Sequence, residues 1–264
     1  MQLIALQYAP IWEDKAASHA LVEDLLAKAE PEPGALAVLP EMSDTGWSFN
    51  TTRITEGDTP QWASEVARRF GIHLQVGYAE LTPAGKGLNC TIMATPDGSL
   101  GAVYRKIHPF SFGSETDHFD GGSEIIVEQL PEAMVCPTIC YDLRFPELYR
   151  HGAMAGAEIF TVIASWPRER AAHWRALVIA RAIENQAWVV AVNRTGQDPS
   201  FSYGGGSLIV SPMGEIMAEG DAIEGVAIAR FDRTEMDKWR ARFPALKDIR
   251  PSLLGKPVID PPAS

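Results

Sequence analysis

Apolar and polar residues form alternating blocks along the first forty positions, and these blocks predict a strand, a helix and a second strand. Residues 3–8 are an apolar run typical of a buried strand. Within residues 14–30, alanine or leucine recurs at every fourth position from 17 to 29, which places these side chains on one face of a helix. Pro31 ends this helix, and residues 35–39 form the second apolar strand.

The rest of the chain continues the alternation, except where turn sequences join two strands into a hairpin. Residues 96–99, Pro-Asp-Gly-Ser, are such a turn. Strands that alternate with helices and are interrupted by hairpins predict an α/β fold with a mixed sheet, or two sheets, and helices outside. The further elements expected are helices at 60–70, 145–155 and 169–186, and strands at 72–79, 89–95, 100–107, 134–140, 158–164, 188–193 and 226–231.

The whole chain, residues 1–264, is expected to form a single domain. It contains no internal repeat, no low-complexity segment and no linker composition that would mark a boundary. Residues 243–264 are polar and carry several prolines, so we expect this C-terminal tail to pack on the surface or at a subunit interface.

The net charge and the number of cysteines indicate which binding partners are disfavoured and which cellular compartment to expect. The 264 residues carry a net charge of −11, which disfavours binding to nucleic acid or to an anionic membrane surface. No run approaches the roughly 20 apolar residues of a membrane span, and the first ten residues lack the basic start of a secretion signal. Three cysteines are too few for a disulfide framework, so we expect a reducing, cytoplasmic compartment.

Cys140 is the first candidate for chemistry, because an apolar strand runs directly into a polar turn and a helix at this residue. A thiol at such a corner lies near backbone N–H groups that stabilise a thiolate or an oxyanion. Taken alone, Cys140 is explained better as a buried core cysteine. A zinc site shared with Cys136 is disfavoured because no second pair of cysteines matches the first.

Glu41 and Lys106 each stand near the end of an expected strand. Glu41 follows strand 35–39 at the edge where a sheet opens to a crevice, and a carboxylate there can act as a general base. Lys106 stands near the end of strand 100–107, where an ammonium group beside a nucleophile would stabilise an oxyanion and lower the pKa of a thiol. Considered singly, each is explained better as a solvated charge.

Together these residues stand in three runs that resemble the motif regions of the nitrilase-like carbon–nitrogen hydrolase superfamily. The runs occur in the family's order, and three later runs extend the resemblance over nearly the whole chain. The six runs are Leu39-Pro-Glu41-Met, Tyr104-Arg-Lys106-Ile-His108, Cys140-Tyr-Asp-Leu-Arg-Phe-Pro-Glu147, Ser165-Trp-Pro167, Ala180-Arg-Ala-Ile-Glu-Asn-Gln186 and Asn193-Arg194.

The resemblance implies a four-layer α-β-β-α sandwich and assembly as a homodimer or a larger homo-oligomer. It implies that Cys140 is the nucleophile, Glu41 the general base and Lys106 the oxyanion stabiliser. Glu115 matches a second active-site glutamate that many members carry on the loop after the lysine. The backbone N–H of Tyr141 would help to hold the oxyanion, and no metal or organic cofactor is required.

Within the family, the cysteine motif and the run 180–186 most resemble the ω-amidase branch. Those enzymes hydrolyse the terminal amide of small dicarboxylic acid monoamides such as 2-oxoglutaramate and 2-oxosuccinamate. Because these substrates carry a carboxylate, the pocket needs a cation besides Lys106, and we expect Arg170 to supply it. Tyr141 and Trp166 are expected to line the substrate site. Arg144 is a weaker candidate for the cation, because an arginine after the nucleophile often braces the structure.

Two departures from ω-amidases leave other substrates open. Pro109 stands where leucine is more common, and the loop carrying Glu115 is shorter than in animal-type enzymes. An aliphatic amidase, a deaminated-glutathione amidase and an N-carbamoyl amino acid hydrolase are the alternatives, whereas Tyr141 and Asp142 disfavour a nitrilase proper. A non-catalytic interaction protein is disfavoured because all three reactive residue types are present. A papain-like protease is disfavoured because no histidine stands in a matching context.

Overall fold

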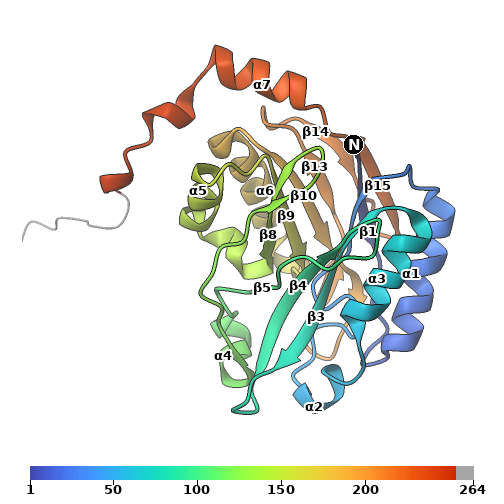
Figure 1. Ribbon diagram of the computed structural model, residues 1–264. Coiled ribbons are helices and arrows are strands. Elements are labelled where there is room, and N and C mark those ends of the chain that lie inside the picture. Colours follow the sequence, from blue (N-terminus) through green and yellow to red (C-terminus); the bar gives the residue numbers. More distant parts are fainter. Residues whose placement is uncertain (254–264) are drawn as a thin grey trace, which may run out of the picture.

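Two β-sheets lie face to face at the centre of the structure, a computed structural model that describes residues 1–253 (Figure 1). The first sheet has the order β15 (Gly225–Arg230), β1 (Gln2–Gln7), β2 (Leu36–Val38), β3 (His73–Leu81), β4 (Gly87–Ala94) and β5 (Tyr104–Arg105), with β6 (Phe119–Asp120) beside β4. The second has the order β14 (Ile216–Glu219), β13 (Leu208–Val210), β10 (Trp188–Asn193), β9 (Ile159–Ala164), β8 (Met134–Ile139) and β7 (Glu128–Gln129). A separate hairpin joins β11 (Thr195–Gln197) to β12 (Ser202–Gly204).

Helices cover the outer face of each sheet. Figure 1 shows α1 (Lys15–Ala29) and α3 (Thr59–Phe70) on the first sheet, and α5 (Pro146–Met154) and α6 (Ala171–Asn185) on the second. The result is the expected four-layer α-β-β-α sandwich, so the predicted fold class is confirmed. The remaining helices are α2 (Thr51–Ile54), α4 (Glu115–His118) and α7 (Arg233–Arg242).

The central strands are mostly apolar because both of their faces are buried. In β1, Leu3 and Ala5 belong to the core between the sheets, whereas Ile4 and Leu6 pack with the side chains of α1 and α3. Since successive side chains of a strand point to opposite faces, a strand between two apolar layers has few polar positions. The apolar run at the start of the chain therefore indicates a strand that is buried on both of its faces.

Most expected elements occur within a few residues of their predicted bounds, and two differ. The strand expected at 100–107 is reduced to β5, Tyr104–Arg105, after an isolated bridge between Ala94 and Leu100. The backbone N–H of Gly101 still donates to Met93 O of β4 at 2.8 Å, and Gly101 lies so close to the Glu128 carboxylate of β7 that a side chain there would collide with it. The helix expected at 169–186 begins at Ala171, because the preceding residues form a 3₁₀ turn.

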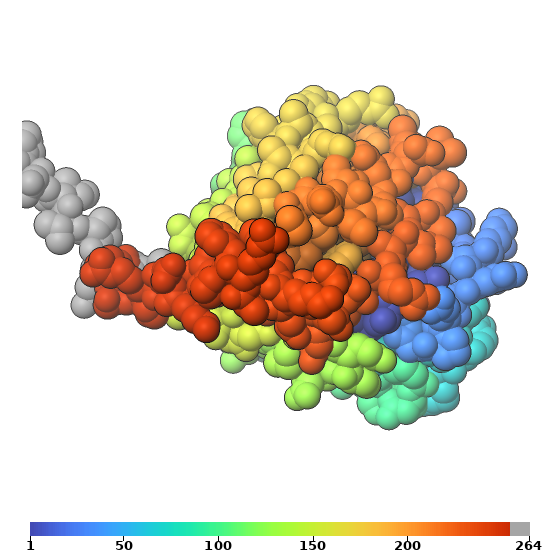
Figure 2. All heavy atoms as spheres, turned by 90° about the horizontal axis from the view of Figure 1, so that it is seen from above, coloured from blue at the N-terminus to red at the C-terminus, as the bar shows by residue number. Residues whose placement is uncertain are grey.

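The C-terminal segment leaves the sandwich after α7. Residues 245–248 and 251–253 form short 3₁₀ turns, and Figures 1 and 2 show this part of the chain reaching away from the body of the molecule. The expectation that 243–264 pack on a surface or a subunit partly concerns residues 254–264, which lie outside the described residues. Among the helices of residues 1–253, none is both long and apolar enough to cross a membrane.

Candidate active site

The ends of strands from both sheets meet at one edge of the sandwich, and reactive side chains stand where the strands end. Glu41 follows β2 and Lys106 follows β5 in the first sheet, whereas Cys140 follows β8 in the second. Such an edge of an α/β structure, at the carboxyl ends of its strands, is where ligand sites usually form. The structure thus brings together three residues that lie 34 or more positions apart in the chain.

A tight turn after β2 carries Glu41, which is fully buried. Gly77 on the neighbouring strand allows the turn to close, because a side chain there would come within 2.7 Å of both Pro40 O and Met42 N. The carboxylate accepts three hydrogen bonds. Lys106 Nζ and Asn89 Nδ2 donate to Oε1, each at 2.8 Å, and the backbone N–H of Ser165 donates to Oε2 at 2.8 Å.

Lys106 lies between two buried carboxylates. Its ammonium group is 2.8 Å from Glu41 Oε1 and 2.8 Å from Glu115 Oε2. Glu115, at the start of α4, also accepts hydrogen bonds from Asn89 Nδ2 at 2.9 Å and from the backbone N–H of Phe110 at 2.6 Å. Every carboxylate oxygen in this cluster therefore has at least one donor, as buried charges require.

The pKa of Lys106 is set by two opposing effects. Burial, the largest of them, favours the neutral amine, but the charges of Glu115 and Glu41 outweigh it and raise the pKa above its usual value. Lys106 is therefore a fixed positive charge at every pH of interest. With both glutamates ionised, the three side chains carry a net charge of −1.

Cys140 adopts a left-handed backbone conformation, with φ of 48°, at the corner between β8 and the 3₁₀ turn Cys140–Arg144. This conformation is uncommon for a residue with a side chain, and such residues cluster at active sites. The residues after the thiol form this 3₁₀ turn, and α5 begins at Pro146, close to the start expected at residue 145.

Asp142 holds this corner in place against the segment that carries Lys106. Its buried carboxylate accepts hydrogen bonds from Ile139 N at 3.1 Å and from the hydroxyl of Tyr104 at 2.7 Å. It also accepts from the backbone N–H of His108 at 3.0 Å, and His108 Nδ1 lies 2.8 Å away. The strand end before Lys106 and the turn after Cys140 are thus tied together through one carboxylate.

The thiol of Cys140 is protonated in this environment. Burial is the main cause that raises its pKa well above the usual value, and the negative charge of Glu41 raises it further. Lys106 opposes both effects but does not outweigh them. A reaction that uses this sulfur as a nucleophile therefore needs a base to remove its proton.

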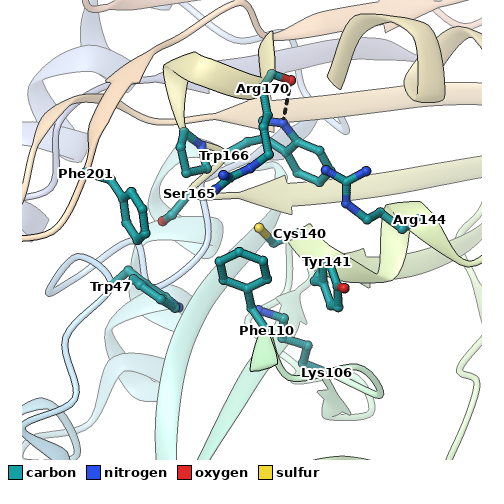
Figure 3. A pocket seen from close by; sticks show the side chains of 11 residues that line it. Trp47, Lys106, Phe110, Cys140, Tyr141, Arg144, Ser165, Trp166, Arg170 and Phe201 are labelled. Atoms are coloured by element: carbon teal, nitrogen blue, oxygen red, sulfur yellow. Dashed lines mark hydrogen bonds between the residues drawn. The ribbon is translucent and has the colours of Figure 1, made fainter. Parts of the chain in front are cut away.

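A pocket of about 350 Å³ opens above Cys140 and Lys106 (Figure 3). Its walls are mostly aromatic, whereas Glu41 and Glu115 are absent from its lining because they lie behind the lysine. The lining residues are Trp47, Lys106, Phe110, Cys140, Tyr141, Arg144, Ser165, Trp166, Pro167, Arg170 and Phe201.

Two arginines line this pocket without a carboxylate partner among residues 1–253. The guanidinium of Arg170 lies over the rings of Phe110 and Phe201, at 5.4 and 5.9 Å, and its Nη2 is buried without a hydrogen bond to the described protein. Arg144 lies over Trp166 at 4.8 Å. Both are held by aromatic faces, so their charges stay available to an anion in the pocket.

Sequence reasoning placed Tyr141, Trp166 and Arg170 at the substrate site, and all three line the pocket. Trp166 is held there by its indole N–H, which donates to Arg170 O at 2.8 Å (Figure 3). Arg144, the weaker candidate for the substrate cation, also lines the pocket and makes no ion pair in the part of the chain described. Several pocket residues and one buried polar residue were missed: Trp47, Asn89, Phe110, Ser165 and Phe201.

Most of the missed residues gave no local signal. Trp47 and Phe201 come from loops with no reactive neighbour, and Asn89 lies within a strand. Ser165 contributes its backbone N–H, which no residue type would reveal. Among residues 1–253, no group of three or more histidine, cysteine or acidic side chains has an arrangement that could hold a metal ion.

Comparison with known proteins gives consistent matches over most of the chain. A family model described as carbon–nitrogen hydrolase matches residues 3–241. The chain is 34% identical to the 2-oxoglutaramate amidase of Bacillus subtilis, over 87% of this chain and 90% of that protein. It is 32% identical to omega-amidase YafV of Yersinia enterocolitica, over 96% and 98%. A crystal structure of a CN-hydrolase superfamily protein from Xanthomonas campestris superposes with a TM-score of 0.87 at 30% identity, covering 97% and 99%.

Proposed function

This chain belongs to the carbon–nitrogen hydrolase family, whose members act on carbon–nitrogen bonds other than peptide bonds, and we propose that it is an ω-amidase-type enzyme. It hydrolyses the terminal amide of a small dicarboxylic acid monoamide, of the 2-oxoglutaramate or 2-oxosuccinamate kind, to a carboxylate and ammonia. Relatives named 2-oxoglutaramate amidase and omega-amidase support this substrate class.

One observation carries the proposal. A protonated thiol, Cys140, shares the pocket floor with Lys106, a lysine whose charge is fixed by Glu41 and Glu115. Arg170, which has no carboxylate partner within residues 1–253, lies in the wall above. The floor provides a nucleophile, a base and an oxyanion-binding cation, and the wall provides a site for the anionic end of the substrate. The pocket is small, which suits a small-molecule substrate.

In the first half of the reaction, Glu41 accepts the proton of the Cys140 thiol as the sulfur attacks the amide carbon. The carbonyl oxygen becomes an oxyanion, which the ammonium of Lys106 and the backbone N–H of Tyr141 stabilise. Glu41 then returns its proton to the amide nitrogen as the carbon–nitrogen bond breaks. Ammonia leaves, and the acyl group remains on sulfur as a thioester.

In the second half, a water molecule takes the place of ammonia. Glu41 accepts a proton from this water as its oxygen attacks the thioester carbon, and Lys106 again stabilises the oxyanion. The carbon–sulfur bond breaks, Cys140 recovers its proton, and the product carboxylate departs. In both halves Glu115 keeps Lys106 charged and in place through the bonds at 3.1 and 2.8 Å.

Arg170 binds the substrate carboxylate in this proposal, while Tyr141 and Trp166 form apolar walls beside it. An arginine whose Nη2 lacks a protein partner gains most from an anion that enters the pocket, because a buried unsatisfied donor is costly. Arg144 lies on the same pocket wall and adds positive potential without being the primary contact.

The test is ammonia release from a panel of 2-oxo acid amides, aliphatic amides, N-carbamoyl amino acids and nitriles. We expect fast release from 2-oxoglutaramate or 2-oxosuccinamate, lost in Cys140→Ala and retained in Cys90→Ala. Cys90 is the matched control because it is also fully buried, but in the core under α1 and α3. Activity confined to another class would overturn the substrate assignment and leave the mechanism standing.

Assembly and location complete the proposal: a homodimer or larger homo-oligomer in the cytoplasm. Phe243 is 55% and Leu253 is 61% exposed in a segment that reaches away from the body, which supports a role at a subunit interface (Figure 2). All three cysteines are unpaired, which supports a reducing compartment. Light scattering should give a dimer or larger for the full chain and a smaller species for a chain ending at Arg242. An unchanged mass would remove the tail from the interface.

A further inference from the structure

Asn89 lies in β4 at a position where the strand pattern calls for an apolar residue. Cys90 and Ile92 face the core under α1 and α3, so the alternate positions of the strand face the second sheet, where Met93 packs in the inter-sheet core. Asn89 points the same way as Met93 and is only 2% exposed. An uncharged polar side chain at such a position needs polar partners to offset its burial.

Its partners are the two glutamates. The side-chain amide donates one hydrogen bond to Glu41 Oε1 at 2.8 Å and another to Glu115 Oε1 at 2.9 Å. Ionised carboxylates only accept, so the atom between them must be the nitrogen, and the orientation of the amide follows from the chemistry. The oxygen Oδ1 has no protein partner in residues 1–253, so the two donated bonds alone orient the side chain.

The backbone of the same residue holds the lysine. The carbonyl of Asn89 accepts a hydrogen bond from the backbone N–H of Lys106 at 2.8 Å. One residue therefore contacts all three charged members of the cluster: the glutamates through its side chain, and the lysine through its backbone. A side-chain substitution at position 89 leaves the backbone bond to Lys106 intact, which separates the two contributions.

We infer that Asn89 is a positioning residue that holds Glu41 and Glu115 ionised and apart, so that Glu41 faces Cys140 as a base; this inference rests on the proposed function. The lysine is one cation between two anions, and it cannot satisfy both carboxylates alone. A second cation would neutralise the cluster and weaken Glu41 as a base. A neutral amide supplies two donors and no charge, which lets both carboxylates remain ionised.

Two variants test the inference. Asn89→Leu keeps the size of the side chain and removes both donors, and Asn89→Ser is a smaller polar change that cannot reach both carboxylates. We expect kcat to fall about 100-fold for Asn89→Leu, with KM changed less than threefold, because hydrogen bonds to charged groups are lost within the cluster and not at the substrate site. Asn185→Leu is the control, since it is also a fully buried asparagine with an unpartnered Oδ1 but lies on α6.

The pH dependence of activity distinguishes this role from a purely structural one, because a residue that only stabilised the fold would not shift the profile. The acid limb should shift to higher pH in both Asn89 variants, because the carboxylates lose the N–H groups that favour their ionised form. The charged and titratable groups that face Glu41 are otherwise unchanged: Lys106, Glu115, Cys140, Arg194 and Tyr203.

Alkylation of Cys140 by iodoacetamide, followed against pH, measures the same shift without any amide substrate. If the wild type alkylates with an acid limb that the Asn89 variants move, the inference holds even when the substrate panel is silent. If the Asn89 variants lose only thermal stability, as Asn185→Leu is expected to do, and keep the wild-type kcat and alkylation profile, the inference is overturned.

Discussion

The floor of the pocket and its wall differ in how their charged side chains are paired. In the floor, Lys106, Glu41 and Glu115 are buried and every carboxylate oxygen has a donor. In the wall, Arg170 and Arg144 are positive and have no carboxylate partner in the described chain, and aromatic rings hold them instead. Lys106 and the two arginines line the same pocket, so the difference is local.

Under the proposed function, the contrast separates the residues that perform the chemistry from those that select the substrate. A saturated hydrogen-bond network keeps its geometry before the substrate arrives, which is what transition-state stabilisation requires. An unsaturated cation gains its partner only when an anion binds, which favours recognition. Substitutions in the floor should therefore lower kcat, and substitutions in the wall should raise KM.

The largest effect is expected for Glu41→Gln, which removes the base and keeps the shape of the floor. Turnover of the best amide should fall by about 10⁴-fold, near the upper end for general base catalysis. Steady-state ammonia release measures this loss, and the exposed Glu65→Gln is the control. A fall of less than tenfold would show that another group removes the thiol proton.

Lys106→Met should affect both activity and folding. Losing the oxyanion-binding ammonium should lower kcat by about 10²–10³-fold. Leaving two buried carboxylates without their cation should lower the free energy of unfolding by about 3–5 kcal/mol. Chemical denaturation and kinetics together check this, and a variant as stable as the wild type would contradict the buried ion-pair geometry.

Arg170→Ala tests the wall. We expect KM for 2-oxosuccinamate to rise about 10–100-fold with little change in kcat, because a charge-assisted contact to the substrate carboxylate is lost. KM for a neutral aliphatic amide should stay within about twofold. Arg168→Ala is the matched control, since Arg168 precedes the same helix and does not line the pocket. Equal effects on anionic and neutral amides would remove Arg170 from carboxylate binding.

The smallest effect is expected at Glu128, a partly buried carboxylate without the cation that the floor provides. Burial raises its pKa from 4.5 to about 7, so the folded state favours the protonated form. Its contribution to stability is full below about pH 4.5 and is lost as the pH rises through about 7. Glu128→Gln should therefore raise the free energy of unfolding at pH 8 by about 1–2 kcal/mol, after allowance for its exposed part.

Denaturation at two pH values checks the sign of this effect. The variant should gain at pH 8 and show little difference from the wild type at pH 4.5. A gain at both values would mean that the change improves packing and not charge. Activity should be unchanged, because Glu128 lies at the edge strand β7 and outside the pocket.

Sequence patterns predicted the helices and strands, and the positions of the residues at the pocket floor, because both depend on local sequence signals. Glu41, Lys106 and Cys140 each follow an apolar strand within a recognisable run, and strand ends converge in this type of fold. The four-layer architecture and the family were expected from the same runs and are confirmed. The strand expected at 100–107 is shortened to Tyr104–Arg105, and the preceding Gly101 packs against Glu128, a contact that no local sequence pattern indicates.

The wall and the support of the floor were predicted less completely, because they depend on tertiary contacts. Trp47, Phe110 and Phe201 come from three loops, and no pattern within any one loop points to a pocket. Arg144 was the weaker candidate for the substrate cation, and the Trp166 ring against which it lies could not be inferred from its local sequence. Asn89 is an unremarkable strand residue until its two glutamate partners are brought to it by the fold.

The backbone N–H of Ser165 belongs to the second sheet, whereas the Glu41 carboxylate that accepts from it belongs to the first. The reacting thiol likewise stands on one sheet and its base on the other. In the proposed mechanism, activity therefore depends on the spacing between the two β-sheets. We therefore expect heat, pressure or cosolvent that separates the two sheets to abolish activity while the hydrogen-bond ladders within each sheet are still whole, so that inactivation precedes unfolding.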